Sequence, residues 1–222
     1  MVETIEENKN IDLKEEESIA EDGNKEPHTS RTRQIRQTKY PLPDARISIL
    51  KQIKVLKAVN ICSNKGKDYV SYQDVAPIVG MNETLVSGTL GFFYKLGLLQ
   101  KDKSRYVPKT EVIEYCNELE WNETGAGEFF RKILMGTWIG SYAINAFKMN
   151  SELSKDELIR NTGRYSQADK YHQAALAQIV DYLEYARIID MDETSKKYKL
   201  ADFDLNEKVS LTKGPEEVKT TI

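Results

Sequence analysis

The sequence predicts a mainly α-helical fold with small β-hairpins, in which one order of elements occurs twice. Apolar residues recur at helical spacing through most of the chain after residue 39. Two pairs of short apolar segments each flank a charged turn, which is the pattern of a β-hairpin. Capping serines and hairpins recur in the same order, and a feature present in two copies is stronger evidence than one copy.

The N-terminal residues differ in composition from the rest of the chain. Residues 1–39 contain no aromatic residue, and residues 1–30 carry ten acidic against three basic side chains. Such a segment cannot bury enough apolar surface to offset the entropy that ordering it costs. We therefore expect residues 1–39 to be a disordered arm, acidic and then basic, and residues 207–222 to be a flexible tail.

The folded part is expected to begin after Pro41 and Pro43, because proline cannot continue a helix and favours an extended residue before it. Asp44 is then the expected N-cap of a first helix over about 45–61. Five apolar residues of this helix recur at helical spacing: Ile49, Leu50, Ile53, Leu56 and Val59.

Two shorter helices follow. Ser71, with Asp74 three residues on, predicts the capped start of a helix that ends near Gly80. Asn82 predicts the cap of a third helix, which runs to about Leu96.

A β-hairpin closes this first unit. Leu98–Gln100 and Tyr106–Val107 are short apolar segments on either side of the charged turn 101–104. The unit is therefore expected to contain three helices and one hairpin, in that order.

The same order returns in the second half of the chain. A long helix is expected over about 127–149, followed by a capping box at Ser154–Glu157. A further helix is expected over about 166–186. A second hairpin is then formed by Ile188–Asp190 and Lys197–Leu200.

Two pairs of residues align the units: Ser154 matches Ser71, and Tyr198 matches Tyr106. The repeat predicts a division of the chain after the arm into a first domain at 40–110, a linker helix or loop at 111–126 and a second domain at 127–206.

This order of helices, cap and hairpin resembles the winged-helix domains of the helix-turn-helix superfamily, in two tandem copies at about 46–108 and 127–202. The resemblance covers the pattern of elements and points to no particular member of the superfamily. Many winged-helix proteins are DNA-binding regulators and many others are protein-docking modules, so the fold does not choose between these functions.

The charge of the chain is unevenly distributed. Residues 31–39 carry four basic and no acidic side chains, and residues 40–110 carry 11 basic and 5 acidic ones. Residues 111–222 carry 14 basic and 20 acidic side chains. A basic stretch between two acidic flanks indicates a polyanionic partner.

The resemblance implies that the third helix enters the major groove and that the hairpin contacts phosphates. Thr84 and Ser87 can hydrogen-bond to bases or phosphates, but the helix contains no Arg, Gln or Asn, and the alternative is a small-residue face that packs against protein. The hairpin and the arm supply positive charge, which phosphate contacts require. The residues expected to bind DNA are Arg31, Arg33, Arg36, Lys39, Thr84, Ser87, Lys101, Lys103, Arg105 and Lys109.

The second unit offers fewer candidates for DNA contact. Gln173 can read adenine, Lys170 can reach a phosphate, and Gln167 lies beside them in the sequence. Acidic residues share this helix and the unit is net acidic, so we favour a structural or protein-binding role for it.

Residues 133–147 contain no charged residue, so the predicted long helix should be buried in protein. Gly136 and Gly140 allow close approach of another helix, with Trp138 between them. We expect a homodimer interface or a seam between the domains here, with packing inside the second domain as the alternative.

Several classes of protein are not expected. No apolar run is long enough to span a membrane, and the acidic N-terminus lacks the apolar core of a secretion signal. Two cysteines and one histidine in the folded part give no metal site, no cofactor site and no catalytic triad. The expected protein is cytoplasmic and has no enzymatic activity.

The leading hypothesis is a DNA-binding protein, either a transcriptional regulator or a nucleoid-associated factor, which holds double-stranded DNA by a basic hairpin and arm. The alternative is a scaffold whose winged helices bind protein partners without DNA contact, for which the second domain is the candidate surface.

Overall fold

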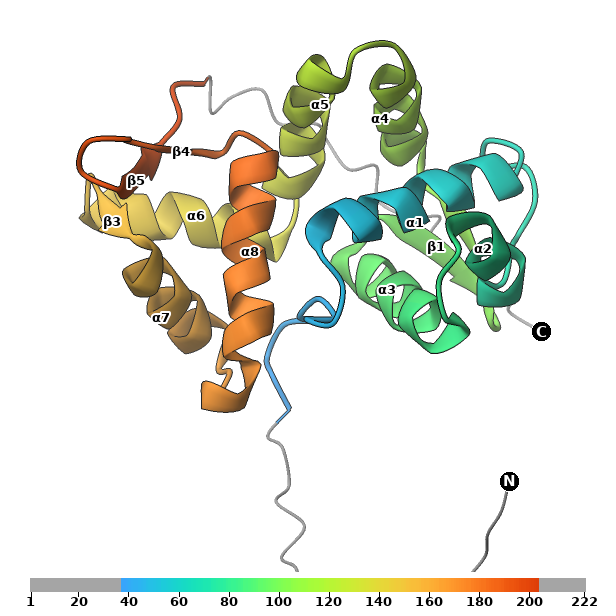
Figure 1. Cartoon of the computed structure of the whole chain (residues 1–222), viewed down its shortest axis with the longest axis horizontal. Helices are drawn as coiled ribbons and strands as arrows, with labels where there is room; N and C mark the ends of the chain where they lie inside the picture. The colour runs from blue at the N-terminus through green and yellow to red at the C-terminus, as the bar shows by residue number, and fades with distance from the viewer. Residues whose placement is uncertain (1–36, 204–222) are drawn as a thin grey trace, which may run out of the picture. The chain divides into compact units, whose positions relative to one another are not determined.

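Three helices and a hairpin occupy residues 49–108, which we call the first repeat after the pattern predicted from the sequence, and Figure 1 shows them in blue to green. The computed structural model describes residues 37–203, except for the side chains of residues 123 and 124. The elements of the first repeat are α1 (Ile49–Cys62), α2 (Tyr72–Val79), α3 (Glu83–Leu96), β1 (Leu99–Asp102) and β2 (Arg105–Pro108).

The caps predicted for α2 and α3 are confirmed. The Ser71 hydroxyl accepts a hydrogen bond from the Asp74 backbone N–H, and the Asp74 carboxylate accepts one from the Ser71 N–H at 2.8 Å. Gly80 ends α2 in the left-handed conformation, with a φ of 64°. The Asn82 side chain then accepts a 2.8 Å hydrogen bond from the Thr84 N–H at the start of α3.

The predicted start of the first helix is wrong. α1 begins at Ile49 after Ser48, and Asp44 lies outside it. The Asp44 carboxylate accepts a 3.0 Å hydrogen bond from the Arg46 backbone N–H and pairs with the Arg46 guanidinium at 2.6 Å. An aspartate that bonds to the backbone two residues on closes a local turn, and this turn competes with helix capping.

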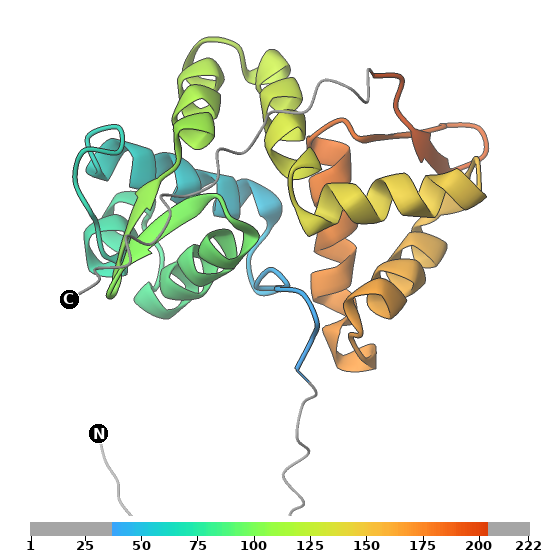
Figure 2. The same ribbon diagram turned by 180° about the vertical axis from the view of Figure 1, so that it is seen from behind.

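The hairpin β1–β2 lies against α1 and α3 (Figure 2). The two strands are antiparallel, with Lys101 opposite Tyr106 and Asp102 opposite Arg105. This confirms the first predicted hairpin.

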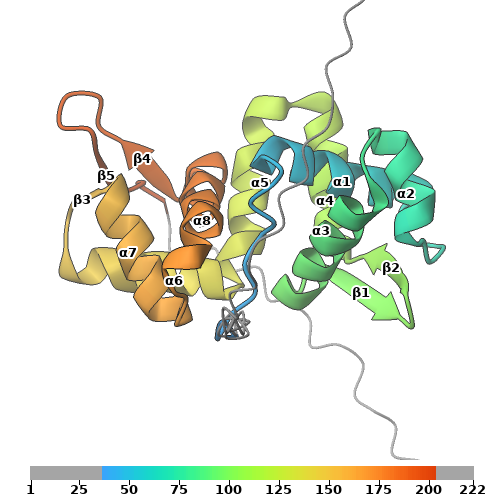
Figure 3. The ribbon, with the colours of Figure 1, turned by 60° about the horizontal axis from the view of Figure 1, so that its bottom comes forward.

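Residues 138–200 follow the order of elements predicted for the second unit, and we call them the second repeat. Its elements are α6 (Trp138–Met149), β3 (Leu153–Ser154), α7 (Lys155–Ser166), the 3₁₀ turn η1 (Lys170–His172), α8 (Gln173–Tyr185), β4 (Ile189–Met191) and β5 (Lys197–Leu200). The predicted capping box is confirmed, because the Ser154 hydroxyl accepts from the Glu157 N–H and the Glu157 carboxylate accepts from the Ser154 N–H at 2.8 Å. β5 lies between β3 and β4 in one small sheet (Figure 3), which confirms the second hairpin.

One strand pairing is common to both repeats. Val70, just before the cap of α2, pairs with Tyr106 of β2. Leu153, just before the cap of α7, pairs with Tyr198 of β5. The residue before each capping serine therefore lies opposite the hairpin tyrosine in an antiparallel pairing.

The long helix predicted over 127–149 is wrong. Two helices occupy this stretch together with part of the predicted linker: α5 (Glu123–Met135) and α6, while α4 (Thr110–Trp121) precedes them. The break lies at Gly136 and Thr137. The Thr137 hydroxyl donates to the Leu134 carbonyl at 2.7 Å and accepts from the Ile139 N–H at 3.1 Å, so a polar cap interrupts an apolar run.

Gly140 explains how α6 can begin so close to α5. A Cβ atom at Gly140 would lie 2.5 Å from the Met135 Cα and 2.7 Å from the Leu134 carbonyl oxygen. Gly136 and Gly140 therefore do not face a partner from one continuous helix. Gly136 lies in the tight turn between the two helices, and Gly140 lies in the first turn of α6.

The helix predicted over about 166–186 also begins elsewhere. Residue Ser166 belongs to α7, which ends at Gln167 in the left-handed conformation with a φ of 56°. The η1 turn follows, and α8 begins at Gln173. The overall fold class is as predicted, mainly helical with small antiparallel sheets of two and three strands.

Buried hydrogen bonds join the two repeats. Gln52 on α1 donates to the Gln178 side chain on α8 at 2.8 Å, and Gln178 donates to the Ile47 carbonyl at 2.6 Å. These two glutamines have exposed fractions of 0% and 8%, so their polar groups depend on each other for hydrogen bonds.

Candidate nucleic-acid interface

Three exposed cations lie on the β1–β2 hairpin: Lys101, Lys103 and Arg105. We call these three residues the basic hairpin. Lys103 adopts the left-handed conformation with a φ of 51°, at the tip between β1 and β2. Among residues 37–203, none of the three cations pairs with a carboxylate within 4.0 Å. Their charge is therefore available to a partner.

Lys101 is held by aromatic rings. Its ammonium lies 5.6 Å from the centre of the Tyr94 ring and 5.4 Å from the centre of the Tyr106 ring. The two rings meet edge to face, with centres 6.3 Å apart. This cation–π contact restricts the position of the Lys101 charge between α3 and the hairpin, while the side chain remains exposed.

Arg105 lies near the start of α2. The pKa of Asp74 is below its ordinary value, chiefly because the Ser71 N–H and hydroxyl donate to it and, to a smaller extent, because Arg105 is positive. Within residues 37–203 the Arg105 side chain donates no hydrogen bond to Asp74, so its donors remain available.

Lys109 directly follows β2 and lies near the end of α3. Its ammonium lies 3.9 Å from the position that a Cβ atom would take at Gly97, the residue that ends α3. A cation at the carboxyl end of a helix is favourable because the last carbonyl groups carry partial negative charge. Lys109 is also half-buried, so the structure gives it a role within the fold beside the predicted DNA contact.

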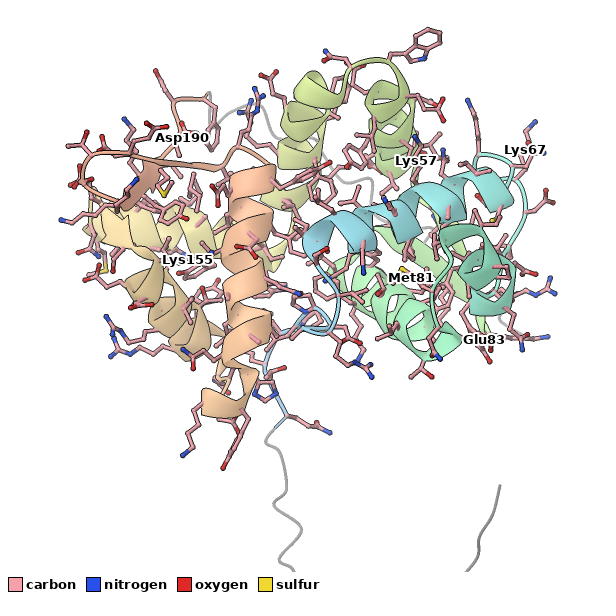
Figure 4. The ribbon with its side chains drawn as sticks, viewed as in Figure 1. Lys57, Lys67, Met81, Glu83, Lys155 and Asp190 are labelled. Carbon is pink, nitrogen blue, oxygen red and sulfur yellow. The ribbon has the colours of Figure 1, made fainter. Side chains whose placement is uncertain are left out.

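The third helix is exposed at its start, and Gly88, Tyr94 and Lys95 are exposed further along it. Thr84 is exposed and Ser87 is half-buried, and Figure 4 shows Glu83 at the same end of α3. Further along, the Asp44 carboxylate lies 3.4 Å from the position of a Cβ atom at Gly88. A hollow of about 460 Å³ lies between the middle of α3 and residues 38–43, which we call the entry segment and which include Pro41 and Pro43. Part of the small-residue face therefore meets the chain's own entry segment.

The equivalent helix of the second repeat is more deeply covered. Gly97 lies two residues before β1 and has a φ of 87°. Arg187 lies two residues before β4 and has a φ of 51°, so the two positions correspond. In this register Gly88 of α3 corresponds to Gln178 of α8. Gln178 packs against α1, so this face of α8 is not free to enter a groove of DNA.

A further contact holds α8 within its own repeat. The Lys155 ammonium on α7 donates to the Asp181 carboxylate on α8 at 2.9 Å, and Figure 4 labels Lys155. The repeat therefore uses polar groups of α8 for its own packing.

The second-unit residues predicted for DNA contact come together around a pocket. Gln167, Lys170 and Gln173 line a cavity of about 670 Å³ at the corner between α7 and α8. Arg160 and Arg164 line the same cavity, and the sequence analysis did not predict them. Their spacing of four residues, shortly after the predicted capping box at Ser154–Glu157, is the signal that could have found them.

The basic arm is attached where it enters the described residues. Arg31, Arg33 and Arg36 lie outside the described residues. The Lys39 backbone N–H donates to the Ser166 carbonyl at 2.8 Å. The next residue, Tyr40, stacks on Trp138 with ring centres 5.0 Å apart.

Tyr40 also stacks on Tyr165 with ring centres 5.4 Å apart. Trp138, predicted for a dimer interface or a domain seam, therefore contacts the segment that leads into the first repeat. Parallel aromatic pairs of this kind contribute beyond the area that they bury.

Comparison with known proteins adds no identity: no family model matches the chain, and no curated protein or solved structure matches it. Within residues 37–203, no helix combines the length and apolar character that crossing a membrane requires.

Proposed function

We propose that this protein binds duplex DNA through phosphate contacts and that its two repeats are tandem winged-helix domains. The observation that carries the proposal is the basic hairpin, whose three cations are exposed and unpaired among the described residues. In this reading β1–β2 is the wing of the first domain and α3 is the helix that approaches the groove.

The contacts are expected to be largely independent of DNA sequence. The start of α3 carries exposed Thr84 and half-buried Ser87 but no long hydrogen-bond donor, and Glu83 beside them is negative. Recognition of a specific base pair usually requires a bidentate Arg, Lys, Asn or Gln. Phosphate contact needs only positive charge and reach, so a nucleoid-associated factor or a regulator of broad specificity fits these residues.

The two repeats have different roles in this proposal. The first presents its hairpin and the start of α3, while the second buries one face of α8 against α1. The second hairpin also differs, because Asp190, Asp192 and Glu193 share it with its lysines. The second domain therefore supports the first and carries the attachment of the basic arm.

Fluorescence anisotropy with a mixed-sequence duplex of about 20 base pairs, at several salt concentrations, tests this proposal. Reversing Lys101, Lys103 and Arg105 to Glu should weaken binding equally for unrelated sequences. It should also reduce the slope of log affinity against log salt by about 2 to 3, because three phosphate contacts are lost.

The second hairpin provides a matched control. Reversing Lys196, Lys197 and Lys199 to Glu changes the same number of charges, and Lys196 shares the left-handed conformation of Lys103. This control should leave the slope unchanged. An equal loss in both variants would show that net charge, and not the basic hairpin, governs binding.

Exposed apolar side chains favour a second candidate function, docking of a protein partner. Trp121 is 89% exposed at the end of α4, and Ile78 on α2 is 58% exposed. If the wild-type protein does not bind duplex DNA at low salt, the scaffold function replaces the DNA-binding one.

A further inference from the structure

A pocket of about 670 Å³ opens at the corner where α7 leads into α8. Part of its lining is apolar, from Ile159, Gly163, Ala168 and Leu176. A Cβ atom at Gly163 would lie 3.2 Å from a methyl group of Leu176, so glycine allows α7 and α8 to close tightly here. The volume is within the usual range for pockets that bind small molecules, about 300–1,000 Å³.

Three cations line the same pocket. Arg160 and Arg164 lie one helical turn apart on α7, so they share a face of the helix. Lys170 reaches the pocket from η1. All three are exposed, and within residues 37–203 none pairs with a carboxylate inside 4.0 Å.

Asp169 is the one carboxylate among the residues that line this pocket, and it already accepts hydrogen bonds within the chain. Its Oδ1 accepts a 3.0 Å hydrogen bond from the Tyr171 N–H and lies 2.8 Å from His172 Nδ1. Asp169 thereby caps η1, and the three cations keep a positive excess in the pocket.

Two amide side chains complete the polar part of the lining. Gln173 comes from the first turn of α8, and Gln167 is the residue that ends α7. Gln167 adopts a φ of 56°, a conformation that glycine adopts without strain. Strained residues of this kind are concentrated at ligand sites. Both amides offer donors and acceptors to a bound molecule.

We propose that this pocket binds a phosphate monoester with an apolar body. Arg160, Arg164 and Lys170 hold the phosphate, because guanidinium groups bind its oxygens in pairs and three cations match a dianion. The apolar body lies on Ile159, Ala168 and Leu176. A DNA backbone would use the cations but not the apolar lining, so a small amphipathic phosphate fits the pocket better. The site does not depend on DNA binding by the basic hairpin.

Titration of the full-length ¹⁵N-labelled protein with 1-naphthyl phosphate tests the proposal by NMR. Amide signals of residues 159–176 should shift and saturate at about 1 mM ligand or below. Inorganic phosphate should bind at least tenfold more weakly because it lacks the apolar body, and 1-naphthol should bind more weakly because it lacks the charge. Shifts that do not saturate, or that fall elsewhere, would overturn the proposal.

Two variants make the test specific. Arg160→Ala with Arg164→Ala should weaken naphthyl phosphate binding at least tenfold. Lys148→Ala with Lys199→Ala removes two exposed cations of the same repeat outside the pocket and should leave binding unchanged. The NMR spectrum of each variant shows whether it is folded.

DNA binding by the same variants separates this site from the interface proposed above. The arginine variant could lose affinity for duplex DNA as strongly as the reversed basic hairpin does, while naphthyl phosphate binds no better than inorganic phosphate. In that case the pocket is a contact for DNA phosphates and the small-ligand proposal is wrong. If naphthyl phosphate binds while wild-type DNA binding is absent, the pocket proposal stands and the DNA-binding function fails.

Discussion

The Tyr182 hydroxyl donates a 2.8 Å hydrogen bond to the Gln52 side chain, and both side chains are completely buried. Gln52 lies on α1 of the first repeat and Tyr182 on α8 of the second. The bond from Gln52 to Gln178 extends the network. A buried polar group that loses its partner cannot return to water, so its loss costs more free energy than one hydrogen bond contributes.

Gln52→Leu should lower the free energy of unfolding by about 2–4 kcal/mol, because it leaves buried groups of Gln178 and Tyr182 without their partner. Tyr182→Phe removes a single donor and should cost about 1–2 kcal/mol. Urea denaturation measures both. The double variant should lose less than the sum, since the two residues share one network. Strictly additive losses would contradict this. Gln73→Leu, at an exposed position of α2, is the control.

Removing the N-terminal residues should reveal how the arm takes part in DNA binding. Residues 1–30 carry ten acidic side chains beside the basic residues that follow, so they can compete with DNA phosphates for those residues. Deleting residues 1–30 should tighten duplex binding a few-fold at low salt, and the gain should disappear at high salt.

Deleting residues 1–36 should weaken DNA binding instead, because it removes Arg31, Arg33 and Arg36. This truncation keeps Lys39 and Tyr40, whose contacts with Ser166 and Trp138 belong to the described fold. Equal affinities for the two truncated proteins and the full chain would exclude the arm and its acidic neighbour from the interface.

Arg187→Gly should stabilise the protein by about 0.5–1 kcal/mol. Arg187 has a φ of 51° at the position that Gly97 occupies in the first repeat, and a side chain is strained in that conformation. The ion pair that is lost, to Glu128 at 3.8 Å, is exposed and contributes little. Thermal or urea unfolding measures the change. Gly97→Ala is the reciprocal variant and should destabilise, and a gain from it would contradict the strain argument.

Gly140→Ala should destabilise the protein by about 1–3 kcal/mol, because the new methyl group would overlap the backbone of Met135. The loss should be the same at every protein concentration, since the contact lies within one chain. A loss that decreases as concentration rises would restore the predicted dimer interface at this glycine. Light scattering of the wild-type protein measures its oligomeric state directly.

The sequence by itself determined the features that depend on residues close together in the chain. Ser71, Asn82 and Ser154 cap their helices through bonds that span two or three residues, so the residue types and their spacing were sufficient. The two hairpins and the exposed cations of the first hairpin follow from equally local patterns.

Only the tertiary structure decided what each helix face meets. An apolar run is the same pattern in one long helix as in α5 and α6, although the Thr137 cap that breaks the run is itself local, with bonds to Leu134 and Ile139. The sequence around Gln178 gives no sign that this glutamine is buried. It contacts Gln52 of α1, which is 126 residues away in the sequence. Likewise, Arg160 and Arg164 share a pocket with Lys170 only because the chain reverses direction between α7 and α8. Burial and partnership depend on residues distant in sequence, and local spacing does not record which distant residues will meet.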